Sequence, residues 1–169
     1  MDARSALKND NLKMKKMKKI LLVFLVALSL NGFAQQKDLV WHTDVNKAIN
    51  ISTQSGKPLF LFFTGSDWCG WCKKLVAEVF EKPEFKKWAS KNIVLVELDF
   101  PKRTPISEQL QKQNRELQQM FGVRGYPTGW FVTPKKVNDK VEFNKLGSQG
   151  YVRGGANAWI NGASQIINK

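Results

Sequence analysis

Apolar residues along this chain follow two patterns. Residues 58–63 ("PLFLFF") and 92–100 ("NIVLVELDF") are mainly apolar runs bounded by turn or polar residues, which is typical of strands buried on both faces of a sheet. Elsewhere the apolar residues recur every three or four positions, which indicates helices with one buried face. These helical stretches are 43–56, the segment that follows Cys72, 106–121 and 156–167.

Capping and turn residues set the limits of these helices. Thr43 is the expected cap of the first helix, and Gly56 with Pro58 stops it. Pro83 predicts a kink or an interruption in the second helix. Gly122 is expected to end the third helix.

The last strands of the predicted fold are short. They are expected at 129–133 and 140–147, joined through "PKKVND". The complete order is helix, strand, helix, strand, helix, strand, strand, helix, which favours one α/β domain with a central sheet covered on both faces. In such sheets, active sites gather at the carboxyl ends of the strands.

The beginning of the chain has the three-part layout of a secretory signal peptide. A basic segment, Lys13–Lys19, precedes the apolar run Ile20–Leu30, and the small residues Gly32 and Ala34 predict cleavage between Ala34 and Gln35. The apolar run is shorter than the about 20 residues that span a bilayer. We therefore expect a periplasmic or secreted protein. An uncleaved anchor that leaves the protein facing the periplasm is the alternative.

Charge argues against nucleic-acid binding. The chain has 27 basic and 14 acidic residues, a net charge of +13, but residues 1–34 hold seven basic and two acidic ones, which leaves residues 35–169 with 20 against 12, or +8. The remaining lysines are scattered and not interleaved with aromatics, which is typical of a solvated face. We expect no nucleic-acid partner. Residues 1–34 are the expected leader and signal peptide, and translation starts at Met1, Met14 or Met17. Residues 35–169 are the expected α/β domain.

The only two cysteines, Cys69 and Cys72, lie three residues apart in "DWCGWCKK". A structural disulfide that closes so small a loop removes little entropy from the unfolded chain. A zinc site requires about four ligands, and beyond the cysteines the chain offers only His42, its single histidine. We therefore expect no metal and no cofactor. His42 is expected at the surface or at a strand edge rather than as a catalytic base.

The cysteine pair follows the strand 58–63 directly, at the start of a predicted helix. Unpaired N–H groups and the dipole at a helix start stabilise a thiolate. Cys69 is therefore the expected attacking thiolate. Cys72, one turn further on the same side, is the expected resolving thiol, which releases the mixed disulfide by forming an intramolecular bond.

These residues resemble two motifs of the thioredoxin superfamily. "DWCGWCKKL" is similar to its "WCGxC" motif, and "GVRGYPT" at 122–128 is similar to the segment with its cis-proline loop. With "GYVRGG" before the last helix, the chain looks most like exported bacterial proteins of the thiol:disulfide interchange type. The resemblance implies a thioredoxin-like fold with a central mixed β-sheet flanked by helices on both faces. It also implies that Pro127 is a cis-proline packed against the disulfide, and that the backbone of Tyr126 faces the sulfurs and pairs with substrate.

The resemblance further implies that Trp68, Gly70 and Trp71 contact the substrate. Both tryptophans have a second interpretation as ordinary packing around the helix that carries the cysteines. In the functional interpretation Trp68 shields the sulfurs and Trp71 offers an exposed apolar contact.

Two positions depart from ordinary thioredoxins. Phe63 stands where they have a buried carboxylate, six residues before the first cysteine, and no neighbouring acid plainly replaces it, since Asp67 is expected at the surface. Trp71 stands at the position between the cysteines that tunes the reduction potential. Potentials in this superfamily span roughly −270 to −120 mV, so the direction of the reaction stays open.

The function expected from the sequence is thus an exported thiol–disulfide oxidoreductase that reduces or isomerises disulfides. Its expected partners are envelope proteins that contain disulfides or cysteines, and a membrane-bound electron donor that reduces it again. We expect a monomer. A net disulfide oxidant, and a thioredoxin-fold binding or assembly module without turnover, are the alternatives.

Overall fold

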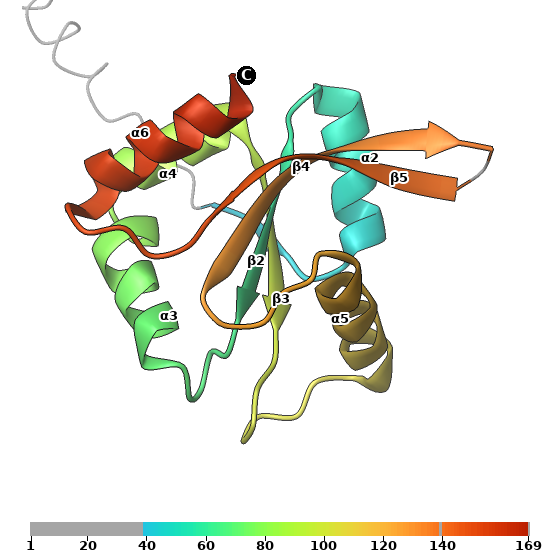
Figure 1. The fold of residues 1–169 in the computed structure, drawn as a ribbon, viewed down its shortest axis with the longest axis horizontal. Helices are drawn as coiled ribbons and strands as arrows, with labels where there is room; N and C mark the ends of the chain where they lie inside the picture. The colour runs from blue at the N-terminus through green and yellow to red at the C-terminus, as the bar shows by residue number, and fades with distance from the viewer. Residues whose placement is uncertain (1–38, 139, 169) are drawn as a thin grey trace, which may run out of the picture. The chain divides into compact units, whose positions relative to one another are not determined.

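The computed structural model describes residues 39–138 and 140–168. The expected leader and signal peptide, with the cut after Ala34 and the alternative membrane anchor, lie outside the described residues. In chain order the elements are β1 (Trp41–His42), α2 (Val45–Ser55), β2 (Leu59–Thr64), α3 (Gly70–Leu75), the π-helical segment η1 (Val76–Phe80), α4 (Pro83–Asn92), β3 (Val94–Asp99), α5 (Glu108–Met120), β4 (Thr128–Val137), β5 (Lys140–Gln149) and α6 (Gly155–Ile167) (Figure 1).

The strands form one mixed sheet in the order β1-β3-β2-β4-β5. β1 and β2 both run parallel to β3, whereas β4 runs antiparallel to β2 and β5 antiparallel to β4. Helices α3, α4 and α6 lie on one side of the sheet and α2 and α5 on the other (Figure 1). This confirms the predicted α/β class with helices on both faces.

β2 is the central strand and is buried along its whole length. Phe60 and Phe62 face a core that α3, α4 and α6 cover, whereas Leu61 and Phe63 face a second core under α2 and α5. Fully burying one such side chain gains about 1.5–3 kcal/mol. The continuous apolar run of this strand therefore supplies both cores, and its fixed position places the residues that follow it.

The first helix begins one residue later than the sequence indicates. Asp44, not Thr43, is the cap, because its Oδ1 accepts hydrogen bonds from the backbone N–H groups of Asn46 (2.9 Å) and Lys47 (3.3 Å). Aspartate and threonine are both good caps, and only the side chain that reaches the first turn can fill the role. Gly56 ends the helix with φ 70°, in the left-handed region that glycine adopts without strain.

The helical segment after the cysteines is interrupted near Pro83, as predicted. α3 continues without a break into the π-helical segment η1, which ends at Phe80. Lys82 then adopts an extended backbone and Pro83 takes the first position of α4. Proline suits that position because its missing N–H group has no partner within the helix there.

The two last strands are longer than the sequence indicates, ten residues each instead of five and eight. The segment from Pro134 to Val137, expected as a connection, continues β4. β2 pairs with β4 only as far as Val132, so Pro134 lies beyond the reach of β2 and has a sheet neighbour on one side only. A proline is tolerated there, because a backbone N–H on the open side has no strand to bond.

β1 was not predicted, because it has only two residues. It pairs with β3 at the sheet edge and places His42 there, as the sequence analysis expected. Burial, and secondarily the charge of Lys47, lower the pKa of His42 below its usual value. Over the part of the chain that the structure describes, no helix is long and apolar enough to span a membrane.

Candidate active site

The cysteine pair lies at the carboxyl end of the central strand β2, as predicted. After Thr64 the chain turns, and the N–H of Cys69 donates to the carbonyl of Gly65 (2.8 Å). Cys69 then caps α3 with an extended backbone, φ −81° and ψ 103°. The buried strand therefore fixes where the helix starts and where the first sulfur lies.

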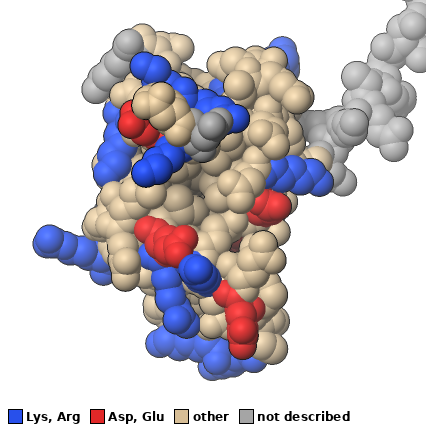
Figure 2. All heavy atoms as spheres, turned by 90° about the vertical axis from the view of Figure 1, so that its right-hand side faces the viewer, with Lys and Arg blue, Asp and Glu red and all other residues tan. Residues whose placement is uncertain are grey.

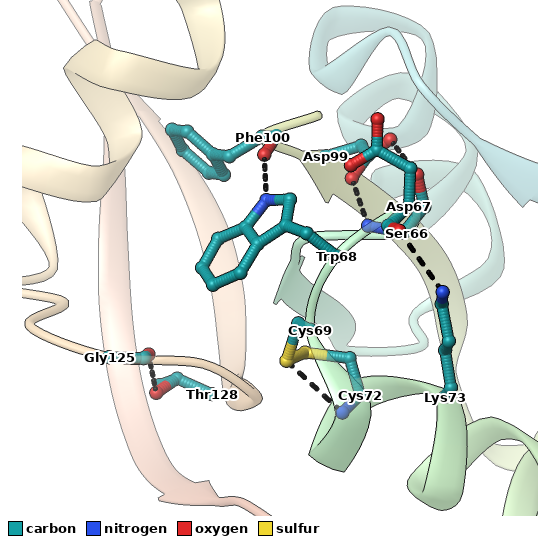
Figure 3. Close-up of a disulfide and its surroundings, with 10 residues drawn as sticks. All are labelled: Ser66, Asp67, Trp68, Cys69, Cys72, Lys73, Asp99, Phe100, Gly125 and Thr128. Atoms are coloured by element: carbon teal, nitrogen blue, oxygen red, sulfur yellow. Dashed lines mark hydrogen bonds between the residues drawn. A yellow bond between two sulfur atoms is a disulfide. The ribbon is translucent and has the colours of Figure 1, made fainter. Parts of the chain in front are cut away.

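Cys69 and Cys72 are joined as a disulfide, with an S–S length of 2.05 Å and Cα atoms 5.3 Å apart. The backbone N–H of Cys72 points at Sγ of Cys69 at 3.2 Å (Figure 3). An N–H in this position stabilises negative charge on that sulfur once the disulfide is reduced. In this oxidised form Cys69 is only 6% exposed and Cys72 1%. Both cysteines are therefore buried in this form, and Cys69 is only slightly more exposed than Cys72.

Trp68 lies beside the disulfide (Figure 3) and makes three contacts with other segments. Its Nε1 donates to the carbonyl of Phe100 (2.8 Å). Its ring meets that of Tyr126 edge to face, with centroids 5.8 Å apart, and the Lys102 ammonium lies 4.2 Å from its centroid. With 37% of its surface exposed, Trp68 both packs against the fold and offers a surface next to the sulfurs.

Trp71, between the two cysteines in the sequence, is 56% exposed. Its ring contacts Tyr151 at 5.2 Å, and the Lys74 ammonium lies 5.1 Å from the centroid of Trp71 and 5.3 Å from that of Tyr151. Tyr151 donates its hydroxyl hydrogen to Glu78 (2.6 Å), which raises the pKa of Tyr151. Trp71 thus packs against Tyr151 and also keeps an exposed surface.

The segment from Gly125 to Thr128 lies across from the disulfide (Figure 3). Its Tyr126–Pro127 peptide bond is cis, as the resemblance implied. The Tyr126 ring lies tilted against that of Phe100, with centroids 5.2 Å apart, and packs against the core that contains the cysteines. Burial, and secondarily the charge of Asp99, raise the pKa of Tyr126.

Gly70 is exposed at the first position of α3, and a Cβ built there meets nothing within 4 Å. Its small size is therefore not required by the fold itself. The roles of Gly70, Pro127 and the aromatic residues in binding a substrate stay predictions.

Two aspartates tie the turn before Cys69 to the segment that follows β3, a feature that the sequence analysis missed. The Asp67 carboxylate lies at the surface, as expected, but it accepts backbone hydrogen bonds from Lys102, Arg103 and Thr104 at 2.6 to 3.1 Å. These bonds, that from Lys102 first, lower the pKa of Asp67. Asp99 accepts hydrogen bonds from the backbone N–H and the hydroxyl of Ser66, at 2.8 and 2.5 Å.

Phe63 occupies the position of the carboxylate in ordinary thioredoxins and is fully buried. It packs on Phe100 and Phe121, with ring centroids 6.5 and 6.2 Å away. Two carboxylates flank it in the register of the sheet: Glu97 pairs with Phe62 and Asp99 with Thr64. Glu97 lines a cavity of about 370 Å³ on the other face. Burial, with a smaller effect of Asp99, raises the pKa of Glu97.

No group of three or more metal-ligating side chains is found in residues 39–138 and 140–168. The described site therefore consists of the disulfide, the aromatic residues around it, and the two segments that Asp67 and Asp99 join by hydrogen bonds.

The profile of the thioredoxin-like domain matches residues 45–137, more than half of the chain. The chain belongs to the thioredoxin-like family. The match begins with α2 and ends with β4, so it includes the cysteine pair and the segment with Pro127. The predicted resemblance to the thioredoxin superfamily is thereby confirmed.

Among curated relatives, this thioredoxin-like chain is similar to two proteins of Chlamydia pneumoniae. It is 35% identical over 115 residues to the disulfide bond reductase DsbH, covering 68% of this chain and 65% of DsbH. It is 34% identical over 137 residues to the thioredoxin-related protein DsbJ, covering 78% of this chain and 38% of DsbJ. The chain thus spans less than two thirds of either relative.

Solved structures agree on the fold. A DsbH oxidoreductase superposes with a TM-score of 0.69 and 32% identity, covering 78% of this chain and 85% of that one. A thioredoxin from Thermus thermophilus superposes with a TM-score of 0.57 and 18% identity, covering 76% of this chain and 87% of the other. The second likeness supports the thioredoxin-like fold alone.

Proposed function

We propose that this protein is a thiol–disulfide oxidoreductase that uses Cys69 and Cys72 to reduce disulfides in other proteins. The observation that carries the proposal is the disulfide itself, formed at the start of α3 with the N–H of Cys72 directed at Sγ of Cys69. The name of the relative DsbH, a disulfide bond reductase, supports the reductive direction.

The reaction begins with the dithiol form. The Cys69 thiolate attacks one sulfur of the substrate disulfide, so that a mixed disulfide forms and the other substrate sulfur leaves as a thiolate. The Cys72 thiol then loses its proton and attacks Sγ of Cys69, which releases the second substrate thiolate. Two electrons pass from the protein to the substrate, and the protein is left with the Cys69–Cys72 disulfide that the structure contains.

The surroundings of the two sulfurs divide the work between them. Cys69 is slightly more exposed than Cys72 and receives the N–H of Cys72, which stabilises its thiolate. Cys72 is almost completely buried, and its sulfur is bonded to that of Cys69. Cys69 is therefore the nucleophile and Cys72 the resolving cysteine.

A reductase that has been oxidised once needs two electrons and two protons to act again. A dithiol electron donor supplies both, and its thiolate attacks the Cys69–Cys72 disulfide by the same chemistry in reverse. We propose a membrane-bound donor of this class, because Lys13–Lys19 and Ile20–Leu30 have the basic and apolar layout expected of an export signal, and an exported reductase in an oxidising compartment has to be reduced again.

The same signal supports an extracytoplasmic location, where disulfides of envelope proteins form and persist. The protein is expected to start at Gln35 after export. The intact mass of the protein from the envelope fraction tests this, and a species that retains Ile20–Leu30 supports the anchored alternative instead.

Turnover of a disulfide protein tests the activity. With dithiothreitol as the electron donor, the protein is expected to accelerate the reduction of insulin, and neither Cys69→Ser nor Cys72→Ser is expected to sustain turnover. Gln109→Ala, on the exposed surface of α5, is the matched control. A wild-type protein that folds but gives no more reduction than dithiothreitol alone contradicts the proposal and favours a binding module.

A further inference from the structure

Each of the two tryptophans beside the disulfide carries a lysine ammonium on its ring. Lys102 lies 4.2 Å from the centroid of Trp68, and Lys74 lies between the rings of Trp71 and Tyr151 at 5.1 and 5.3 Å. We call these five residues the aromatic–cation border. Since Trp68 precedes Cys69 directly and Trp71 follows it by two residues, a substrate segment that reaches Cys69 passes this border.

The carboxylates on the same segments are already engaged within the protein. Asp67 accepts three backbone N–H groups from the segment after β3, and Asp99 accepts two hydrogen bonds from Ser66. Glu78 accepts the hydroxyl hydrogen of Tyr151 and lies 3.8 Å from the Lys74 ammonium, so Lys74 already has one carboxylate partner. Their hydrogen bonds direct these negative charges at the fold rather than at an incoming ligand.

The cations on these segments point the other way, toward solvent. Lys102 and Arg103 follow β3, Arg124 precedes the segment with Pro127, and Arg153 lies between β5 and α6; all four are exposed. In Figure 2, Lys and Arg side chains are spread over the visible face, and those at the lower end, where β2 and β3 terminate in Figure 1, lie next to acidic side chains. The segments around the disulfide therefore carry four exposed cations.

We infer that the aromatic–cation border binds polypeptide segments whose reactive cysteine is flanked by aspartate or glutamate. The inference rests on the proposed function and names the kind of substrate for that site. A carboxylate beside the substrate cysteine pairs with the ammonium of Lys102, or with that of Lys74 in competition with Glu78, as the sulfur reaches Cys69. The exposed indole faces of Trp68 and Trp71 contact the apolar parts of the segment.

Three synthetic peptides test this preference. They share one sequence and one cysteine, which is linked to 2-mercaptoethanol as a mixed disulfide, and differ only in two flanking residues, both Glu, both Gln or both Lys. Reduced protein converts each to the free peptide thiol and 2-mercaptoethanol while its own disulfide forms, so electrons balance, and 2-mercaptoethanol carries no charged group besides its sulfur that could bias the comparison. Chromatography of the released peptide gives the rate constant.

The Glu peptide is expected to react about tenfold faster than the Lys peptide at low salt, since charge complementarity raises association rates by about 10–1,000-fold. In 1 M NaCl, where the screening length is about 3 Å, the ratio is expected to approach one. The double variant Lys74→Gln/Lys102→Gln is expected to lose most of the ratio at low salt. Its matched control, Lys87→Gln/Lys91→Gln, removes the same charge from exposed positions of α4 and is expected to keep it.

The outcomes separate the two proposals. Equal rates for the three peptides overturn the charge preference and leave the oxidoreductase activity intact. A ratio that the Lys74→Gln/Lys102→Gln and Lys87→Gln/Lys91→Gln variants reduce equally shows a net-charge effect and overturns the role of the border. If no peptide is reduced, the proposed function fails, and the substrate preference that depends on it fails too.

Discussion

Replacing Gly65 by alanine is expected to displace Trp68 from its place beside the disulfide. A Cβ built on Gly65 lies 2.5 Å from Cε2 and 2.6 Å from Nε1 of the Trp68 indole, closer than atoms approach without one of them moving. The indole then loses its hydrogen bond to Phe100, worth about 0.5–1.5 kcal/mol, and its edge-to-face contact with Tyr126, worth about as much. The free energy of unfolding should fall by about 1–3 kcal/mol.

Gly70→Ala is the matched control, because it makes the same change on the other side of Cys69 where a Cβ meets nothing within 4 Å. Alanine is favoured over glycine in a helix by up to about 1 kcal/mol, so this variant should be as stable as the wild type or slightly more. Urea unfolding of the oxidised proteins measures both effects, and the indole N–H resonance of Trp68 reports its displacement. A Gly65→Ala protein with unchanged stability and an unmoved resonance refutes the described packing.

Three further substitutions test other parts of the account. Phe63→Asp should lower the free energy of unfolding by at least about 3 kcal/mol, the cost of emptying a buried aromatic site. The loss should be smaller at pH 5 than at pH 7.5, because burial raises the pKa of the new carboxyl. Unchanged stability, with an ordinary pKa for this carboxyl, contradicts the burial of position 63. Glu97 has a folded-state pKa above its usual 4.5, so its carboxylate destabilises the fold above that pH. The wild type should therefore gain stability as the pH falls toward 4.5, and Glu97→Gln should gain less. Urea unfolding at several pH values contradicts this if the stability of both proteins changes equally with pH. Cys72→Ser should accumulate mixed disulfides with substrate proteins on non-reducing gels, since attack by Cys69 continues without release, and equal trapping by Cys69→Ser would remove the division of roles.

Those parts of the fold that depend on local patterns could be predicted from the sequence. The continuous apolar run of β2 can only be buried on both faces, and the cysteines that follow it are thereby placed at the carboxyl end of the sheet. The helix interruption at Pro83 follows in the same way from the missing N–H of proline. The lengths of β4 and β5 could not be predicted, because a proline is acceptable at position 134 only when the neighbouring strand ends before it.

The surroundings of the disulfide were predicted less completely, because they depend on contacts between distant segments. Asp67 bonds backbone groups 35 to 37 residues away, and nothing in its own neighbourhood distinguishes it from a solvated aspartate. Tyr151 reaches Trp71 and Glu78 only after the sheet and α6 have formed. The "GYVRGG" motif marked this segment without assigning it a role.

The reduction potential of the Cys69–Cys72 couple tests the central claim, reductive thiol–disulfide exchange at this site, most directly. It is measured by equilibrating the protein with glutathione or thioredoxin redox buffers, trapping free thiols by alkylation and counting them by mass. A reductase is expected to lie between about −270 and −200 mV, the range of thioredoxin and the glutaredoxins. A value near about −120 mV, that of a strong disulfide oxidant, would contradict the account and assign the site to the opposite reaction.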